Sequence, residues 1–213
     1  GAFCLTESQA GSDAAALKTK AVYNNGSYTI NGSKQFITSG QIAGAALIFA
    51  VSNPDAGKKG ITAFMIPTDL PGYKVTSVEQ KMGQKASDTC SLSFDDMHVE
   101  EKYRLGEEGE GYRIALANLE QGRIGIAAQS VGMARSALEY AIAYANERTS
   151  FGKAIMQHQA VGFRLADMAT KLEAARQLVL SAAALRDAEQ PCLKEACMAK
   201  LFASEAAEEI CSA

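Results

Sequence analysis

The chain has 213 residues, of which 47% are hydrophobic, so it can bury the core of one large domain or two small ones. Its 24 acidic and 21 basic residues give a formal net charge of −3, and no long block of one sign occurs. This balance argues against nucleic-acid binding, which needs concentrated Lys and Arg. No apolar run approaches the ~20 residues that span a bilayer, and no basic segment precedes the apolar start as in a signal peptide.

The chain contains five scattered cysteines, an odd number, which predicts reduced thiols rather than a disulfide framework. Cys192 and Cys197 have a spacing that a metal site can use. The only two histidines, His98 and His158, lie far away in the sequence, so we expect buried structural cysteines and no metal site.

Short β-rich runs alternate with turn signals over the first half of the chain. We expect strands at residues 17–23, 27–30, 34–38, 46–52, 61–67, 73–78 and 91–99. Asn25-Gly26 and Asn31-Gly32 predict two tight turns, because Asn and Gly tolerate a positive φ. The spacing predicts a β-barrel or sandwich over residues 1–105.

Helical periodicity begins after residue 105. Residues 124–145 and 161–182 each carry apolar side chains at three- and four-residue steps, and Gln190-Pro191 starts a third such segment. Residues 148–153 predict a turn between the first two helices, and the acidic, Gly-rich residues 106–111 predict a linker. We therefore expect an α+β chain, with the β-domain at 1–105 and an antiparallel helical bundle at 106–213. The third helix has no stop signal, and we expect that both ends of the chain are cut from a longer protein.

Two clusters of small hydroxyl residues adjoin apolar strands. The first is Thr6, Ser8 and Ser12, and the second is Thr38 and Ser39, which follow Phe36 and Ile37. A flavin needs neutral hydrogen-bond donors and flat apolar cover, and both clusters provide them. Hydroxyl residues in loops also form turns, so composition alone leaves that structural alternative open.

Five motifs follow one another in a consistent order along the chain. They are residues 3–13 (FCLTESQAGSD), 31–39 (NGSKQFITS), 81–89 (KMGQKASDT), 122–129 (GRIGIAAQ) and 147–153 (ERTSFGK). This order strongly resembles the acyl-CoA dehydrogenase family over essentially the whole chain. Residues 120–129 (EQGRIGIAAQ) look most like the short/branched-chain members.

The resemblance implies a fold and a set of binding residues. A whole member has an N-terminal helical domain, a middle β-domain and a C-terminal four-helix domain, of which the first and the end of the last are missing here. FAD would be held by Phe3, Leu5, Thr6, Gly11, Ser12, Phe36, Ile37, Thr38, Arg148 and Gln159. Acyl-CoA would be contacted by Ser12, Tyr112, Glu120, Gln121, Gly122 and Arg123.

Most of these positions have a structural alternative. Phe3 and Phe36 could be core aromatics, and Arg148 could be a cation that the C-terminal end of a helix attracts. Tyr112 could be a packing residue and Glu120 a solvated helix residue.

The resemblance also implies a reaction. The family dehydrogenates acyl-CoA thioesters to 2-enoyl-CoA: a glutamate base removes the α-proton while the β-hydride passes to flavin N5, and electrons leave through an electron-transfer flavoprotein. In most members the base lies beyond the position of Ala213. In some it lies at the position of Gly122, which has no side chain, so we assign no catalytic residue to this chain.

The family usually forms a homotetramer, a dimer of dimers. It takes part in fatty-acid β-oxidation or branched-chain amino-acid catabolism, in the bacterial cytoplasm or the mitochondrial matrix. Two alternatives stay open: a non-catalytic FAD- or acyl-CoA-binding module, and an acyl-CoA oxidase.

Overall fold

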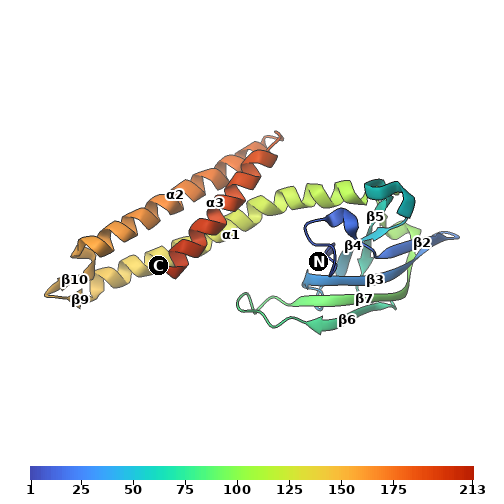
Figure 1. Ribbon diagram of the computed structural model, residues 1–213, viewed down its shortest axis with the longest axis horizontal. Helices are drawn as coiled ribbons and strands as arrows, with labels where there is room; N and C mark the ends of the chain where they lie inside the picture. Colours follow the sequence, from blue (N-terminus) through green and yellow to red (C-terminus); the bar gives the residue numbers. More distant parts are fainter. The chain divides into compact units, whose positions relative to one another are not determined.

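The computed structural model describes all residues, 1–213, and divides them into two compact units (Figure 1). We call Gly1–Leu116 the sheet unit and Ala117–Ala213 the helix unit. The boundary at residue 105 that the sequence suggests stays a prediction. No helix is long and apolar enough to cross a membrane.

The sheet unit is built on one mixed, eight-stranded sheet. Its strand order is β6-β7-β3-β2-β4-β5-β8, and β1 pairs with β4 in parallel. The strands are β1 (Ala2–Cys4), β2 (Lys20–Asn24), β3 (Ser27–Thr38), β4 (Ala45–Val51), β5 (Ile61–Pro67), β6 (Tyr73–Val78), β7 (Thr89–Glu100) and β8 (Arg104–Leu105). Short 3-10 helices lie at Ala14–Ala16, Pro54–Gly60 and Glu101–Tyr103.

The sheet curls around its main core. Tyr28 on β3 and Phe64 on β5 have ring centroids 4.8 Å apart, although β2 and β4 lie between these strands in the sheet order. Both rings are fully buried, and inward-facing residues of β1 to β5 and β7 join them in one cluster. A second cluster around Phe49 and Ile61 covers another part of the sheet and includes Ala115 of α1. The barrel-like character that the sequence predicts for this half is thus present in a curled sheet.

Strands β5 and β6 have the bounds that the sequence predicts, and the turn at Asn25-Gly26 is confirmed. Both turn residues have positive φ, 48° and 86°, and Asn24 pairs with Ser27 across the hairpin. The prediction of a second turn at Asn31-Gly32 is wrong, because residues 27–38 form the single strand β3. Its two halves both pair with β7, and a register shift between Ile30 and Gly32 absorbs the irregularity.

The strand predicted at residues 17–23 begins only at Lys20. The amides of Lys18 and Thr19 donate to the carboxylate of Glu7 and therefore take no part in a ladder there.

The acidic, Gly-rich segment after β8 is folded onto the sheet unit. The Gly109 amide donates to Thr62 Oγ1 at 3.1 Å, and the buried Tyr28 hydroxyl donates to Glu108 Oε1 at 2.6 Å. The segment predicted to be a linker is thus anchored to β3 and β5 by side chains on both.

Three α-helices form the bundle that the sequence predicts: α1 (Gly111–Glu147), α2 (Gln159–Asp187) and α3 (Leu193–Ser212). α1 begins in the sheet unit and continues through the helix unit. Buried residues of all three helices meet in two clusters that are rich in alanine, whose small side chain allows helices to approach closely. The predicted turn at 148–153 is a small hairpin of β9 (Thr149–Ser150) and β10 (Lys153–Ala154), followed by a 3-10 helix at Ile155–Gln157.

Candidate functional site

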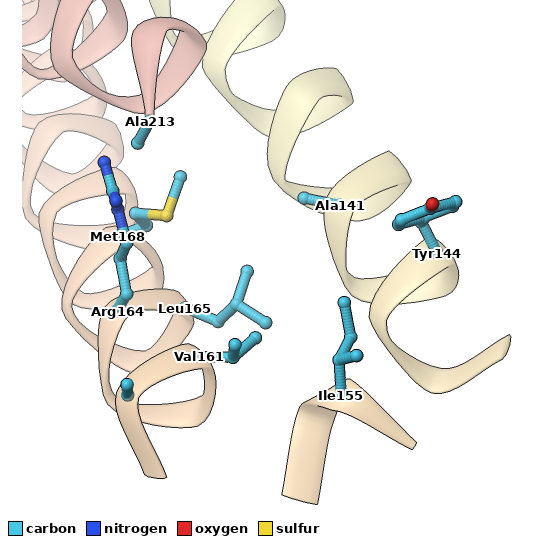
Figure 2. A pocket seen from close by; sticks show the side chains of 9 residues that line it. Ala141, Tyr144, Ile155, Val161, Arg164, Leu165, Met168 and Ala213 are labelled. Atoms are coloured by element: carbon cyan, nitrogen blue, oxygen red, sulfur yellow. The ribbon is translucent and has the colours of Figure 1, made fainter. Parts of the chain in front are cut away.

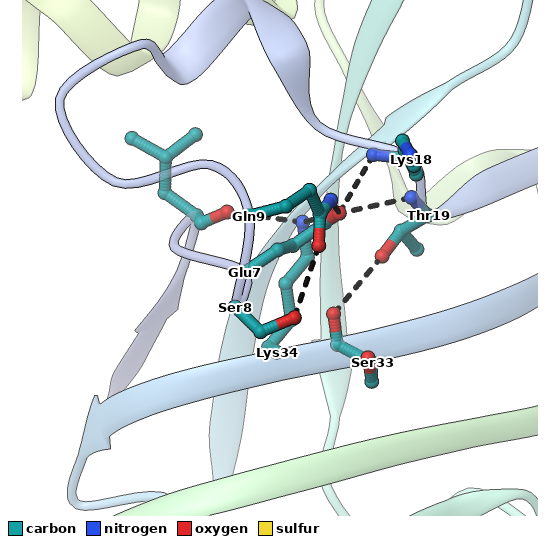
Figure 3. A network of polar contacts seen from close by, with 8 residues as sticks. Glu7, Ser8, Gln9, Lys18, Thr19, Ser33 and Lys34 are labelled. Atoms are coloured by element: carbon teal, nitrogen blue, oxygen red, sulfur yellow. Dashed lines mark hydrogen bonds and ion pairs between the residues drawn. The ribbon is translucent and has the colours of Figure 1, made fainter.

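The segment between β1 and β2 carries the first hydroxyl cluster and is organised by Glu7. The Glu7 carboxylate accepts hydrogen bonds from the amides of Lys18 (2.6 Å) and Thr19 (3.0 Å) and from Gln9 Nε2 (2.6 Å) (Figure 3). Glu7 and Ala10 also exchange both backbone hydrogen bonds, at 3.0 and 3.1 Å. One buried carboxylate therefore fastens the start and the end of the loop that carries Gly11 and Ser12.

A buried lysine on β3 completes this network. Lys34 Nζ lies 2.8 Å from Glu7 Oε1 and donates to the carbonyl of Leu5 at 3.1 Å (Figure 3). The Lys34 side chain is 0% exposed and that of Glu7 is 3% exposed. Burial alone would raise the pKa of Glu7, but the charge and hydrogen bond of Lys34, with the bonds from Lys18 and Thr19, lower this pKa to about 2. The Glu7 carboxyl is thus ionised at neutral pH. Burial lowers the pKa of Lys34, and the charge and hydrogen bond of Glu7 oppose this shift, so the ammonium depends on its partner.

The second cluster lies on β3, directly after Lys34, where the strand bulges. The pairing of β3 with β7 shifts register between Lys34 and Ile37, and Phe36 takes a φ of 57°, in the left-handed region. The Phe36 side chain is 58% exposed, whereas Ile37 is buried in the main core. A positive φ is uncommon for a bulky residue other than glycine, and such backbone strain is found most often at functional sites, so the exposed Phe36 marks a candidate ligand surface.

The structure brings Thr6 of the first cluster to the segment of β3 that leads into the second cluster. The Gln35 amide donates to the carbonyl of Thr6 at 2.8 Å, which places Thr6 one residue from Phe36 across the bulge. All five hydroxyl residues of the two clusters reach the surface of this unit: Thr6 and Ser39 are partly exposed, and Ser8, Ser12 and Thr38 are exposed.

Two of the aromatic and apolar residues predicted near a flavin pack into the protein. Phe3 is half-buried against Phe49, with ring centroids 5.1 Å apart, and Leu5 is buried in the same cluster. Phe36 is not a core aromatic, so the structural alternative holds for Phe3 in part and not for Phe36.

Arg148 and Gln159 flank the hairpin in the helix unit. Arg148 directly follows α1, its carbonyl accepts from the amide of Ile155 at 2.8 Å, and Gln159 is the first residue of α2. His158 Nε2 lies 3.1 Å from the Ser150 carbonyl and closes the hairpin onto the start of α2. Arg148 and Gln159 are exposed, and the Arg148 guanidinium makes no ion pair, so it is free to meet an anion.

The residues predicted to contact acyl-CoA lie along α1. In the sheet unit, Tyr112 packs on the second core, and Lys58 Nζ lies 5.2 Å from the centre of its ring. In the helix unit, Glu120 is half-buried, lies 3.6 Å from Cys192 Sγ, and lines a polar cavity of about 560 Å³ with Arg186. Gln121 and Gly122 are exposed, and Arg123 is half-buried.

A second cavity in the helix unit, of about 420 Å³, is mainly apolar (Figure 2). Its lining comes from α1, the 3-10 helix after the hairpin, α2 and the last residue: Ala141, Tyr144, Ile155, Ala160, Val161, Arg164, Leu165, Met168 and Ala213. In both units, no group of three or more His, Cys, Asp or Glu side chains is placed to hold a metal ion. All five cysteines are free; Cys4, Cys90 and Cys192 are buried as predicted, whereas Cys197 and Cys211 are exposed.

Sequence reasoning did not single out Glu7 or Lys34. The sequence did contain a signal. Lys34 lies an even number of residues after the buried Tyr28 and Ile30, so strand alternation places it on the same face of β3. A lysine at an inward position requires a buried acidic partner, but the two-residue alternation does not say which one.

Comparison with known proteins agrees with this fold and with the order of these segments. Residues 2–97 match the model of the acyl-CoA dehydrogenase middle domain, and residues 109–213 match that of the acyl-CoA dehydrogenase C-terminal domain. The chain belongs to the acyl-CoA dehydrogenase family.

Curated relatives and solved structures are similar over nearly the whole chain. An acyl-CoA dehydrogenase of Bacillus subtilis is 51% identical over 97% of this chain, and the mitochondrial short/branched chain specific acyl-CoA dehydrogenase of Rattus norvegicus is 46% identical over 97%. Butyryl-CoA dehydrogenase from Megasphaera elsdenii is 43% identical and superimposes with a TM-score of 0.97, covering 99% of this chain and 55% of that one. The chain spans about half the length of the curated relatives it matches, 55% of the first and 48% of the second.

Proposed function

We propose that residues 1–213 are the flavin-holding part of an FAD-dependent enzyme that dehydrogenates short- or branched-chain acyl-CoA thioesters to 2-enoyl-CoA. The observation that carries the proposal is the contact between Thr6 and the bulged end of β3. The Gln35 amide donates to the Thr6 carbonyl at 2.8 Å, directly before the exposed Phe36.

The residues present fit a flavin. An isoalloxazine ring is flat and apolar on its faces and carries hydrogen-bond acceptors and a donor at its edge. The sheet unit offers an exposed aromatic ring at Phe36 and partly or fully exposed hydroxyls at Thr6, Ser12 and Thr38. The only charged pair beside these groups, Glu7 and Lys34, is internally neutralised and buried.

In this proposal Arg148 and Gln159 bind the diphosphate and adenine portion of FAD, in an assembly of several copies of the chain. A guanidinium donates two parallel hydrogen bonds to a diphosphate, and that of Arg148 has no protein partner to displace first. Tyr112 and the residues Glu120, Gln121, Gly122 and Arg123 contact acyl-CoA, together with Ser12.

FAD supplies the hydride acceptor when it is bound. The chain's own residues orient the thioester beside it and exclude water. Removal of the α-proton needs a carboxylate whose pKa is raised by desolvation. We assign this base to no residue of 1–213, because Gly122, the α1 position that carries it in some members, has no side chain and the only buried carboxylate, Glu7, has a lowered pKa.

The relatives also support a partner and two directions of reaction. A similar solved structure, 47% identical with a TM-score of 0.97, is described as an electron transferring flavoprotein of Acidaminococcus fermentans, and a 44% identical relative is the caffeyl-CoA reductase-Etf complex subunit CarC of Acetobacterium woodii. We propose an electron-transfer flavoprotein as the electron acceptor. Because an acryloyl-CoA reductase (NADH) is also 46% identical, a second candidate is the reverse reaction, the reduction of a 2-enoyl-CoA.

Flavin uptake and turnover test the proposal. The purified chain is titrated with FAD and scanned for the flavin bands in the blue and near ultraviolet, and the chain and the full-length protein are assayed with butyryl- and 2-methylbutyryl-CoA and an artificial electron acceptor. We expect flavin binding, turnover by the full-length protein, and little turnover by the chain alone. A colourless sample that takes up no FAD favours a non-catalytic module, appreciable turnover by the chain alone contradicts the absence of a base, and rapid reoxidation of the reduced flavin by O₂ favours an oxidase.

A further inference from the structure

We propose that Glu7 and Lys34 are positioning residues that hold the segment around Thr6 in register with the bulge at Phe36. The identity of the ligand that these segments bind rests on the proposed function. The positioning itself rests on the contacts of the sheet unit alone.

Three hydrogen bonds join residues 5–7 to residues 34–35. Lys34 Nζ donates to the carbonyl of Leu5 at 3.1 Å and to the carboxylate of Glu7 at 2.8 Å, so it brackets Thr6 on both sides (Figure 3). The amide of Gln35 donates to the carbonyl of Thr6 itself at 2.8 Å. Three consecutive residues of one segment are thus fixed to two consecutive residues of the other, directly before Phe36.

Glu7 also closes the loop that follows it. Its carboxylate accepts from Gln9, Lys18, Thr19 and Lys34, which uses about all four of the lone-pair sites that a carboxylate offers. No acceptor capacity remains for a ligand, and the side chain is buried, so Glu7 acts through the backbone that it holds rather than by direct contact. The exposed Gly11 and Ser12 lie within the loop that it closes.

In this proposal the ion pair fixes the register of the two segments more strictly than apolar packing would. A buried apolar pair is often as stable as a buried ion pair, but it tolerates a shift of one segment along the other. A shift here would leave the Lys34 ammonium, which is 0% exposed, without its carboxylate, and that arrangement is strongly disfavoured. The pair therefore selects one arrangement of Thr6 against Phe36.

A double variant, Glu7→Gln with Lys34→Met, tests this role because it removes both charges and nearly keeps the side-chain volumes. The control is Lys74→Met, which removes the exposed Lys74–Asp95 pair with the same separation of 2.8 Å in the same unit. Amide hydrogen exchange of residues 5–18 and of β5 is measured without flavin, and FAD affinity is measured by titration. We expect exchange at residues 5–10 to become about tenfold faster while β5 stays protected, and FAD affinity to fall by about tenfold.

Two outcomes overturn the proposal: exchange at residues 5–10 that is unchanged in a folded double variant, or exchange that rises equally in β5, which signifies a general loss of stability. If the unmodified chain takes up no FAD, the proposed function fails at this site, while the exchange measurement still decides the positioning. If the double variant does not fold, Glu7→Asp keeps both charges but shortens the reach of the carboxylate. Faster exchange at residues 5–10 then supports the proposal, and unchanged exchange overturns it.

Discussion

The carboxylate of Glu7 and the ammonium of Lys34 meet at 2.8 Å in the interior of the sheet unit, where neither side chain reaches solvent. The pair joins the loop after β1 to the bulged end of β3. The same pair makes the stability of this unit sensitive to acid, because the pKa of Glu7 is lowered from 4.5 to about 2.

Acid should destabilise the sheet unit through Glu7. Because the pKa is lower in the folded than in the unfolded chain, the carboxylate contributes stability above about pH 4.5, and this contribution is lost as the pH falls towards about 2. The shift corresponds to about 3 kcal/mol. Urea unfolding at about pH 6 and about pH 3 should show a steeper loss for the unmodified chain than for Glu7→Gln/Lys34→Met. If both proteins lose the same free energy of unfolding between these two pH values, other carboxyl groups govern the acid response.

Gly109→Ala should destabilise the sheet unit more than Gly26→Ala. Both glycines have nearly the same positive φ, 84° and 86°, so both variants bear the same backbone strain of about 1 kcal/mol. A Cβ at Gly109 would lie 2.3 Å from the Lys59 carbonyl oxygen, whereas a Cβ at Gly26 would meet nothing within 4 Å. We therefore expect a total cost of about 2–4 kcal/mol for Gly109→Ala. The free energies of urea unfolding measure both, and equal losses would contradict the close approach of residue 109 to the Lys59 carbonyl.

Phe36→Ala should weaken flavin binding and leave the fold nearly unchanged. The Phe36 ring is 58% exposed, so its removal costs less than about 1 kcal/mol of stability. The control is Phe64→Ala, which empties a fully buried site and costs about 3–5 kcal/mol. Thermal unfolding and FAD titration of the two variants separate the roles. An unchanged FAD affinity in Phe36→Ala would remove Phe36 from the flavin site.

Two of the five thiols should react with a thiol reagent in the folded chain. Cys197 and Cys211 are exposed, while Cys4, Cys90 and Cys192 are buried. Burial also raises the pKa of Cys4 to about 12 and, together with Asp88, that of Cys90 to about 11, so few thiolates form at neutral pH. Counting with a chromogenic disulfide should give two fast thiols in buffer and five in urea. A Cys197→Ser/Cys211→Ser control should show none in buffer, and a fast thiol there would mean that the core opens.

Local patterns predicted most of the elements. Period-two alternation and turn residues located β5 and β6 to the residue, and the Asn25-Gly26 hairpin followed from the tolerance of both residues for positive φ. The same rule failed at Asn31-Gly32, because the pairing of both halves of β3 with β7 overrides a local turn preference. Strand β2 begins at Lys20 and not at residue 17 as predicted, because the distant carboxylate of Glu7 accepts hydrogen bonds from the amides of Lys18 and Thr19.

The sequence predicted only part of the candidate site. The family resemblance predicts that Thr6 and Phe36 belong to one flavin site, and the 2.8 Å bond between Thr6 and Gln35 brings these segments together in the sheet unit. The sequence left open whether Phe3 and Phe36 are core aromatics. A bulge exposes Phe36 and a neighbouring ring at Phe49 half-buries Phe3, and neither follows from local sequence.

By itself the sequence determined the family, the division into a β-rich and a helical half, and the residue types that suit a flavin. These follow from motifs and from periodicities that act over a few residues. Only the tertiary structure decided that Lys34 is paired, that its partner is Glu7, and that residues 106–111 are folded against β3 and β5. Such contacts join residues 27 or more positions apart in the chain, and whether a charge at an inward position is satisfied depends on the curl of the whole sheet rather than on its neighbours in sequence.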